Sequence, residues 1–318
     1  TALAALMDIG WRPEGDVSVM GIRAEESAWF GVSYIGSRSA LGTLPDGALD
    51  DARRADSGRT LADHMAELGC DPETVRSGPP YLEPSSLRAY LELHIEQGPV
   101  LEDRKIPVGI VTGIRGNMRV PKARCVGEYS HCGGVPRTHR RDAAIAVSEL
   151  VMGLDRIWDE CEAQGRDFAF TVGKMATDAK RHAMTIIAGE VDFSVDMRSL
   201  DIAFLDEMEA RIQEMALEIA EKRRVRFDLG RFTRAAPGIL DEGIKARLRE
   251  GVAALDIPAM DIPSGASHDA AAFAAAGVPT AMIFVRNANG SHNPDEAMEI
   301  DDFMKGVELL AWYLANPA

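Results

Sequence analysis

Residues 118–232 contain six segments whose order restricts the possible folds more than any other feature of this sequence. Four segments are predicted to be strands: 118–126, 168–172, 190–198 and 225–232. Two long amphipathic segments are predicted to be helices: 142–162 and 203–222. The order along the chain is β-α-β-β-α-β, which is the order of a ferredoxin-like split βαβ module. We therefore expect one α+β domain in this part of the chain.

This module is predicted to be an insertion, because helices and strands alternate on both sides of it. Before it, strands are expected at 16–22, 90–94 and 107–113, and helices at 1–7, 61–68 and 100–105. After it, helices are expected at 242–255, 270–276 and 303–315, and a strand at 280–285. The expected boundaries place residues 1–114 and 234–318 in an α/β domain and residues 115–233 in the inserted domain.

The charge balance excludes several classes of partner. The chain has 50 acidic and 35 basic residues, which gives a net charge of −15 at pH 7. This argues against binding to nucleic acid or to anionic membranes. No apolar run approaches the roughly 20 residues that span a bilayer, and no signal peptide is visible. The four cysteines lack metal-binding spacing, which predicts reduced thiols in a cytoplasmic protein.

The first residues predict that the chain begins inside a larger unit. A helix that crosses over a parallel sheet needs a strand before it. The helix expected at residues 1–7 has no such strand, and the sequence does not begin with Met.

Side chains of metal-binding type follow three of the predicted strands. Glu25 and Glu26 follow the first strand, His94 ends the second, and His292 lies in a turn after the last. Ligands of open α/β sheets bind at the carboxyl ends of strands. Two imidazoles and a carboxylate suit Zn, Mn, Ni or Co. The spacing is not that of a zinc finger, so a core histidine and a solvated acidic loop remain the alternative interpretations.

Three further features are typical of catalytic or binding sites. Neighbouring residues of an extended chain point to opposite faces, so Glu25 and Glu26 are expected to have different tasks. His131 lies in a glycine-rich loop, where it can donate a hydrogen bond to a developing oxyanion. Arg198 ends a predicted strand, where it can bind a carboxylate or form a surface ion pair.

Taken together, these residues resemble the M20 metallopeptidase superfamily, and within it the amidase/hydantoinase/carbamoylase branch. This branch contains N-carbamoyl-L-amino-acid hydrolases and allantoate or ureidoglycolate amidohydrolases. The most specific match is His94-Ile95-Glu96-Gln97-Gly98-Pro99, followed by Val100-Leu101-Glu102. The resemblance implies a metallo-exopeptidase-like open sheet with helices on both faces. It also implies that residues 115–233 form a lid and dimerisation domain.

The resemblance implies catalytic residues and metal ligands. Glu25 would be the general base and acid, and His131 would stabilise the tetrahedral oxyanion. Glu26, His94 and His292 would be ligands of two divalent ions per subunit, of Zn, Mn, Ni or Co. In such proteins the oxyanion histidine commonly comes from the partner of a homodimer.

The resemblance also implies substrate contacts and an activity. Arg198 would bind the α-carboxylate of a small-molecule substrate, and Gln97 and Asn289 would line the pocket. His268 and Asp269 match a family motif and are expected to have supporting roles. The implied reaction is hydrolysis of the carbamoyl C–N bond of an N-carbamoyl-L-amino acid.

Two alternatives to this activity remain open. The substrate can instead be a ureide such as allantoate or ureidoglycolate, because the residue expected to decide, Thr185, departs from the family's asparagine. The chain can also be a truncated, non-catalytic homologue that serves as a dimerising or ligand-binding module. This second alternative rests on the family's His-x-Asp ligand motif, which is absent from the sequence.

Overall fold

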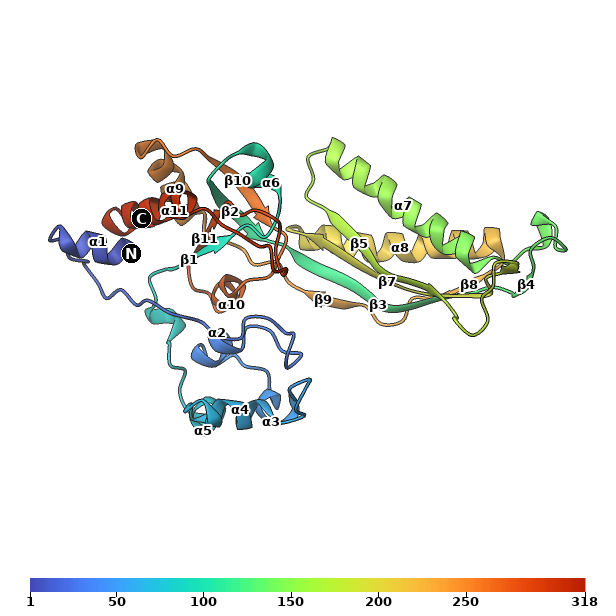
Figure 1. Ribbon diagram of the computed structural model, residues 1–318, viewed down its shortest axis with the longest axis horizontal. Helices are drawn as coiled ribbons and strands as arrows, with labels where there is room; N and C mark the ends of the chain where they lie inside the picture. Colours follow the sequence, from blue (N-terminus) through green and yellow to red (C-terminus); the bar gives the residue numbers. More distant parts are fainter. Residues whose placement is uncertain (318) are drawn as a thin grey trace. The chain divides into compact units, whose positions relative to one another are not determined.

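A computed structural model describes residues 1–317 and divides the chain into two compact units (Figure 1). The large unit comprises Thr1–Ile114 and the chain from Gly238 onward, and the small unit comprises Arg115–Pro237. Residue 318, the last of the range expected for the α/β domain, lies outside the described residues. Within residues 1–317, no helix has both the length and the apolar character needed to cross a membrane.

A four-stranded sheet forms the centre of the large unit. Its strands are β1 (Tyr90–Ile95), β2 (Val108–Ile114), β10 (Ala259–Ser264) and β11 (Thr280–Val285). Their order is β1-β11-β2-β10. β1 is parallel to β11 and β10 is parallel to β2, whereas β11 and β2 are antiparallel. Every residue of β11 is buried, as expected for a strand whose two faces are both covered.

Helices cover both faces of this sheet. α9 (Glu242–Ala254) and α11 (Ile300–Ala315) belong to the apolar cluster that contains Ile283 of β11. α6 (Val100–Arg104) and α10 (Asp269–Ala275) contribute to the cluster that contains Phe284. Adjacent residues of a strand point to opposite faces, so one strand joins both clusters. This arrangement agrees with the expected mixed α/β architecture.

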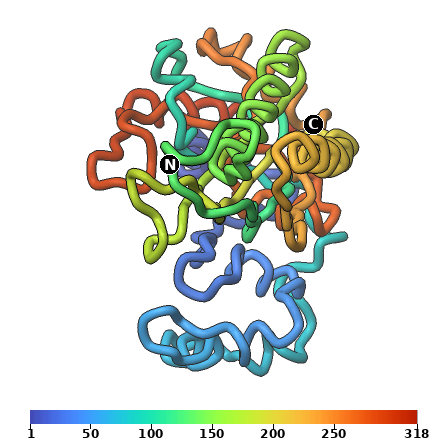
Figure 2. Tube along the Cα trace, turned by 90° about the vertical axis from the view of Figure 1, so that its right-hand side faces the viewer, coloured from blue at the N-terminus to red at the C-terminus, as the bar shows by residue number. Residues whose placement is uncertain are grey.

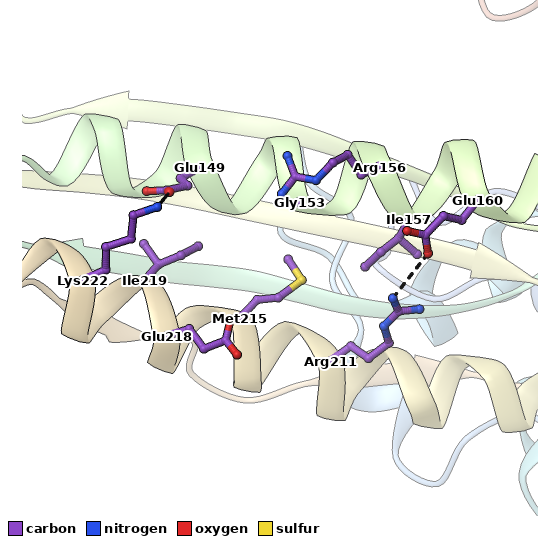
Figure 3. Close-up of a pocket in the computed structure, with 10 residues that line it drawn as sticks. All are labelled: Glu149, Gly153, Arg156, Ile157, Glu160, Arg211, Met215, Glu218, Ile219 and Lys222. Carbon is purple, nitrogen blue, oxygen red and sulfur yellow. Dashed lines mark hydrogen bonds and ion pairs between the residues drawn. The ribbon is translucent and has the colours of Figure 1, made fainter.

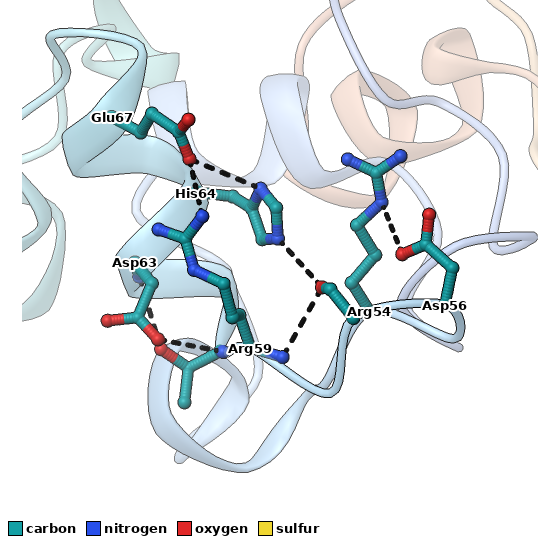
Figure 4. Close-up of polar contacts among 8 residues, drawn as sticks. Arg54, Asp56, Arg59, Asp63, His64 and Glu67 are labelled. Atoms are coloured by element: carbon teal, nitrogen blue, oxygen red, sulfur yellow. Dashed lines mark hydrogen bonds and ion pairs between the residues drawn. The ribbon is translucent and has the colours of Figure 1, made fainter.

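Short helices occupy the remainder of the N-terminal segment. They are α1 (Ala2–Asp8), α2 (Ile35–Ala40), α3 (Ala48–Asp51), α4 (Leu61–Glu67), α5 (Pro72–Ser77) and the 3-10 helix η1 (Pro84–Ser86). Helix α4 packs against α3 and α5, and Figure 2 shows these three helices grouped together in light blue. At the start of α4, the side chains of Thr60 and Asp63 each accept a hydrogen bond from the other residue's backbone N–H (Figure 4). This capping box explains why the helix begins there.

Two segments of the large unit differ from the sequence-based expectation. The buried strand expected at 16–22 is wrong, because this segment is irregular and mostly exposed, with Val19 82% exposed. Apolar residues form a strand only where a neighbouring strand pairs with them, and among residues 1–317 no named strand pairs with this segment. Conversely, β10 was not among the expected strands, and it contains Pro263. It tolerates this proline because it lies at the edge of the sheet.

The small unit has the predicted β-α-β-β-α-β order. Its main elements are β3 (Gly116–Val126), α7 (Ala143–Ala163), β5 (Ala169–Thr177), β7 (Glu190–Ser199), α8 (Ile202–Arg223), β8 (Arg226–Asp228) and β9 (Thr233–Ala235). The sheet order is β5-β7-β3-β8, β9 also pairs with β3, and all these pairs are antiparallel. Of the final strand expected at 225–232, only residues 226–228 form a strand, which is β8. β9 begins at Thr233, beyond the expected range, and Gly230 at φ +63° lies between the two strands.

One face of the small unit's sheet is covered by its two long helices. Residues of β7 alternate between buried and half-buried, and the buried apolar ones belong to the same cluster as α7 and α8. A groove of about 350 Å³ lies between the two helices (Figure 3). It is lined by Glu149, Gly153, Arg156, Ile157, Glu160, Arg211, Met215, Glu218, Ile219 and Lys222. None of the site residues predicted from the sequence lines this groove.

The start of α7 offers a test of how the small unit is stabilised. The Asp142 carboxylate accepts hydrogen bonds from the backbone N–H groups of Ala144 and Ile145, at 3.1 and 3.2 Å. We expect Asp142→Ala to lower the free energy of unfolding of this unit by about 1 kcal/mol. Urea denaturation followed by circular dichroism measures the change. The exposed Asp159, within the same helix, provides the control, and equal losses for Asp142→Ala and Asp159→Ala would contradict the capping role.

Candidate metal centre

Three potential metal ligands meet at the end of β1 in the large unit. Glu92 and His94 are two residues apart on this strand, so their side chains share one face of the sheet. His268 is the residue immediately before α10. One ligand atom from each of the three residues lies within 4.8 Å of the others. We call Glu92, His94 and His268 the β1–α10 cluster.

The hydrogen bond of His94 determines which of its ring nitrogens can bind a cation. Nδ1 lies 2.7 Å from the backbone oxygen of Ile95. A carbonyl oxygen only accepts hydrogen bonds, so Nδ1 must carry the proton. The lone pair is therefore on Nε2, and a backbone carbonyl as the partner of the other nitrogen is typical of metal-binding histidines.

The same reasoning applies to His268. Its Nε2 lies 2.9 Å from the Ser264 hydroxyl, which donates its own hydrogen to the backbone oxygen of Ala266 at 2.8 Å. Nε2 of His268 must therefore be the donor, and the lone pair is on Nδ1. Burial, together with the neighbouring His94, lowers the pKa of His268 to about 3. The ring is thus neutral at pH 7, which is the form that binds metals.

Glu92 supplies an oxygen opposite this lone pair. Its Oε2 accepts hydrogen bonds from the Tyr90 hydroxyl at 3.0 Å and from the Ala270 backbone N–H at 2.8 Å. Its Oε1 lies 4.0 Å from Nδ1 of His268. Two hydrogen-bond acceptors thus face each other at a distance that suits a shared cation. Burial also raises the pKa of Glu92, which a bound cation would oppose.

The paired glutamates of the sequence lie beside this cluster in two different environments. Glu25 is half-buried, whereas Glu26 is exposed and lies 3.1 Å from Nε2 of His292. Burial, followed by the charges of Asp269, Glu26 and Glu92, raises the pKa of Glu25 to about 7. Glu25 therefore interacts with members of both groups: Glu26 of the exposed pair and Glu92 of the β1–α10 cluster.

The other two predicted substrate contacts in the large unit, Gln97 and Asn289, lie beside and within the turn that contains His292. The side-chain amide of Gln97 donates to Ser291 at 3.1 Å, and its backbone N–H donates to Asn287 at 3.0 Å. The exposed Asn289 instead donates to the backbone oxygen of Asp295 at 2.7 Å, within the same turn. The structure thus brings Gln97 beside this turn, while the side chain of Asn289 is used to hold the turn itself.

His131 and Arg198 lie in the small unit. His131 is on β4 (Ser130–His131), which pairs with β6 (Ile186–Ile187), and the 3-10 helix η2 (Arg137–His139) follows in the same loop region. Its Nδ1 accepts hydrogen bonds from the backbone N–H groups of Gly133 and Gly134, both at 3.1 Å. The exposed ring therefore carries its proton on Nε2 and can donate it.

Arg198 is half-buried on β7 and its Nε donates to Asp196 at 2.8 Å. Asp196 is shared with Arg119, whose Nε lies 2.6 Å away. Both alternatives for Arg198, a carboxylate-binding residue and a surface ion pair, remain compatible with this geometry.

Glu92 is the member of the cluster that sequence reasoning missed. Glu92 and His94 are separated by one residue in a predicted strand, and this spacing was the available signal. His268 was expected only in a supporting role, although its lone pair faces Glu92. The position of His268 depends on the contact between α10 and β1. His94 and His268 are 174 residues apart in the sequence, so local patterns do not reveal this contact.

The family model of peptidase family M20/M25/M40 matches residues 1–316. The chain belongs to this peptidase family. Among its M20 relatives, the N-carbamoyl-L-amino acid amidohydrolase of Geobacillus stearothermophilus is 36% identical over 308 residues, which cover 94% of this chain and 71% of that protein. The allantoate amidohydrolase of Escherichia coli K12 is 30% identical over 324 residues, which cover 98% of this chain and 75% of that protein.

A solved structure supports the same assignment. It is an amidase of the hydantoinase/carbamoylase family from Burkholderia multivorans, with a TM-score of 0.85 and 28% sequence identity. The match covers 98% of this chain and 73% of that chain. The resemblance inferred from the sequence is therefore confirmed at the level of the family and its mixed α/β fold.

Proposed function

We propose that this chain is a metal-dependent amidohydrolase that cleaves the carbamoyl C–N bond of N-carbamoyl-L-amino acids. The observation that carries the proposal is the β1–α10 cluster, in which two imidazole lone pairs and a carboxylate converge beside Glu25. The similarity to an N-carbamoyl-L-amino acid amidohydrolase supports the choice of substrate.

The donor set fits a divalent ion of the Zn, Mn, Ni or Co type. Glu26, His94 and His292 are proposed as ligands of two ions per subunit, and Glu92 and His268 extend this set around His94. When bound, such an ion supplies Lewis acidity and increases the acidity of water. The crowding of Glu25, Glu26, Glu92 and Asp269 supports this assignment, because positive charge would relieve their mutual repulsion.

In the proposed reaction, the oxygen of a water molecule attacks the carbamoyl carbon while Glu25 accepts a proton from this water. Glu25 then gives this proton to the nitrogen of the leaving amino acid. A group with a pKa near neutrality suits both steps. The products are the free amino acid and carbamate, which breaks down to carbon dioxide and ammonia.

Two residues of the small unit complete the proposed mechanism. His131 donates a hydrogen bond from its Nε2–H to the oxyanion, and Arg198 orients the substrate through the substrate's α-carboxylate. We propose that residues 115–233, which lie within the small unit, act as a lid and dimerisation domain. In the resulting homodimer, His131 would serve the site of the partner subunit. A cytoplasmic location is part of the same proposal and rests on the sequence alone.

A ureide such as allantoate or ureidoglycolate is the second candidate substrate. Its support is the similarity to an allantoate amidohydrolase over nearly the whole chain. The backbone oxygen of Thr185 accepts a hydrogen bond from Cys132 at 2.9 Å, which places Thr185 beside the loop of His131. We therefore expect Thr185 to determine which of the two substrates is preferred.

Side-by-side assays distinguish these candidates. The purified chain is supplied with Mn²⁺, Co²⁺, Ni²⁺ or Zn²⁺ and given N-carbamoyl-L-methionine, its D-enantiomer, allantoate or ureidoglycolate. We expect kcat/KM for the L-carbamoyl substrate to exceed that for either ureide by about tenfold or more, a difference of roughly 1.4 kcal/mol in transition-state binding. A preference for a ureide would replace the first proposal with the second. No turnover with any ion would favour the non-catalytic alternative.

A further inference from the structure

The loop that carries Glu25 is held by the first residues of α2. The backbone N–H of Tyr34 donates to the oxygen of Glu25 at 2.7 Å, and that of Ile35 donates to the oxygen of Ala24 at 3.1 Å. Gly36 donates to the oxygen of Arg23 at 3.1 Å. A Cβ at Gly36 would lie 2.5 Å from that oxygen, so the close approach requires glycine. The position of Glu25 therefore follows the position of α2.

A buried hydrogen bond connects α2 to α10. The hydroxyl of Ser37 donates to Oδ1 of Asp269 at 2.5 Å. Ser37 is fully buried and Asp269 is 5% exposed. A hydrogen bond to a buried carboxylate is stronger than one between neutral groups, because water does not compete for either partner. These two side chains thus connect parts of the sequence that are 232 residues apart.

The residues on either side of Asp269 contact the β1–α10 cluster. His268 is itself a member of the cluster, and the backbone N–H of Ala270 donates to Glu92 at 2.8 Å. Three consecutive residues therefore connect the cluster on one side with Ser37 on the other. A path of hydrogen bonds joined by short stretches of backbone therefore runs from Glu92 through α10 and Ser37 to the loop of Glu25.

We propose that Ser37 and Asp269 form a positioning pair that sets the place of Glu25 relative to the β1–α10 cluster. This inference rests on the proposed function and adds two residues to its site. The charge of Asp269 is close to Glu25 and raises that residue's pKa, so burying a carboxylate here is unfavourable for stability. An apolar contact would join the two helices at lower cost, but without the directionality of a hydrogen bond.

The test compares Ser37→Ala and Asp269→Asn with the control variant Ser39→Ala. Ser39 lies in the same helix, and its hydroxyl is buried without a hydrogen-bond partner, so its removal breaks no hydrogen bond in the structure. We expect Ser37→Ala to lower kcat by about 10- to 100-fold, because a small displacement of a catalytic group has effects of this size. KM and the affinity for Mn²⁺ should stay within about twofold of the wild type. The double variant should be no slower than Asp269→Asn alone, since both changes remove one interaction.

A second measurement does not depend on turnover. Hydrogen exchange of peptides covering residues 23–36 should become roughly tenfold faster in Ser37→Ala than in Ser39→Ala, because α2, which holds this loop, loses its hydrogen bond to the charged Asp269. Unchanged exchange in this segment would overturn the positioning pair even if the chain has no amidohydrolase activity. Parallel losses of kcat, KM and Mn²⁺ affinity would also overturn it, because they would indicate general damage to the site. An inactive wild type with faster exchange in Ser37→Ala would reject the proposed function and keep the positioning pair.

Discussion

Glu25→Gln is expected to slow hydrolysis of N-carbamoyl-L-amino acids by at least about 100-fold while the metal content stays unchanged. The amide of glutamine has nearly the shape of the carboxylate but cannot accept a proton from water. General acid–base catalysis contributes about 10²- to 10⁴-fold to a rate, so kcat should fall by that amount. Burial, followed by the charges of the neighbouring acidic groups, raises the pKa of the half-buried Glu25 to about 7, which is near the pH at which such a base works best. Steady-state kinetics and elemental analysis of the same preparation measure both quantities.

The control for Glu25→Gln is Glu14→Gln, an exposed glutamate outside the site. It should leave kcat and KM unchanged. A Glu25→Gln enzyme that retains activity within a few-fold of the wild type would show that another group accepts the proton. Loss of metal in the same variant would instead indicate that Glu25 is a ligand and that its task has been exchanged with that of Glu26.

His94→Ala is expected to remove metal binding at the β1–α10 cluster. The substitution deletes the Nε2 lone pair and leaves Glu92 and His268 as a two-residue remnant. Loss of a residue that only hydrogen-bonds to a metal ligand lowers metal affinity by about 10- to 100-fold. Loss of the ligand itself should therefore lower it further. Calorimetric titration of the metal-free protein with Zn²⁺ measures the change in Zn²⁺ affinity. Hydrolysis should be lost in the same variant.

The control for the metal prediction is His64→Ala. His64 lies on α4, and its ring packs edge-on against Phe30, outside the site. Zn²⁺ affinity should not change in this variant.

Glu92→Gln then separates two possible ligand sets around His94. If it weakens binding as much as His94→Ala, Glu92 is a ligand, whereas unchanged binding would leave Glu26 and His292 as the partners of His94. Unchanged Zn²⁺ affinity in His94→Ala itself would reject the metal centre.

Much of the fold follows from local patterns in the chain. The order of elements in the small unit was predictable because its two long helices and the strands β3 and β7 each repeat their own period over ten or more residues, and tertiary contacts agree with it. The helix starts at Asp142, Asp201 and Asp241 are local in the same sense, because each carboxylate accepts a hydrogen bond from a residue two or three positions later. The types of side chain in the site were also visible as imidazoles and carboxylates at expected strand ends.

Pairing between distant segments is what local patterns do not contain. Residues 16–22 have the composition of a strand but no strand neighbour among the described residues, whereas β10 contains a proline and is a strand because β2 pairs with it. Glu92 became a candidate ligand only when α10 placed His268 opposite its free oxygen. Likewise, nothing near Ser37 or Asp269 in the sequence indicates their hydrogen bond, because the two residues are 232 positions apart. Short-range periodicity and capping are encoded within a few residues, but the distances on which a metal centre depends arise from contacts between segments far apart in the chain.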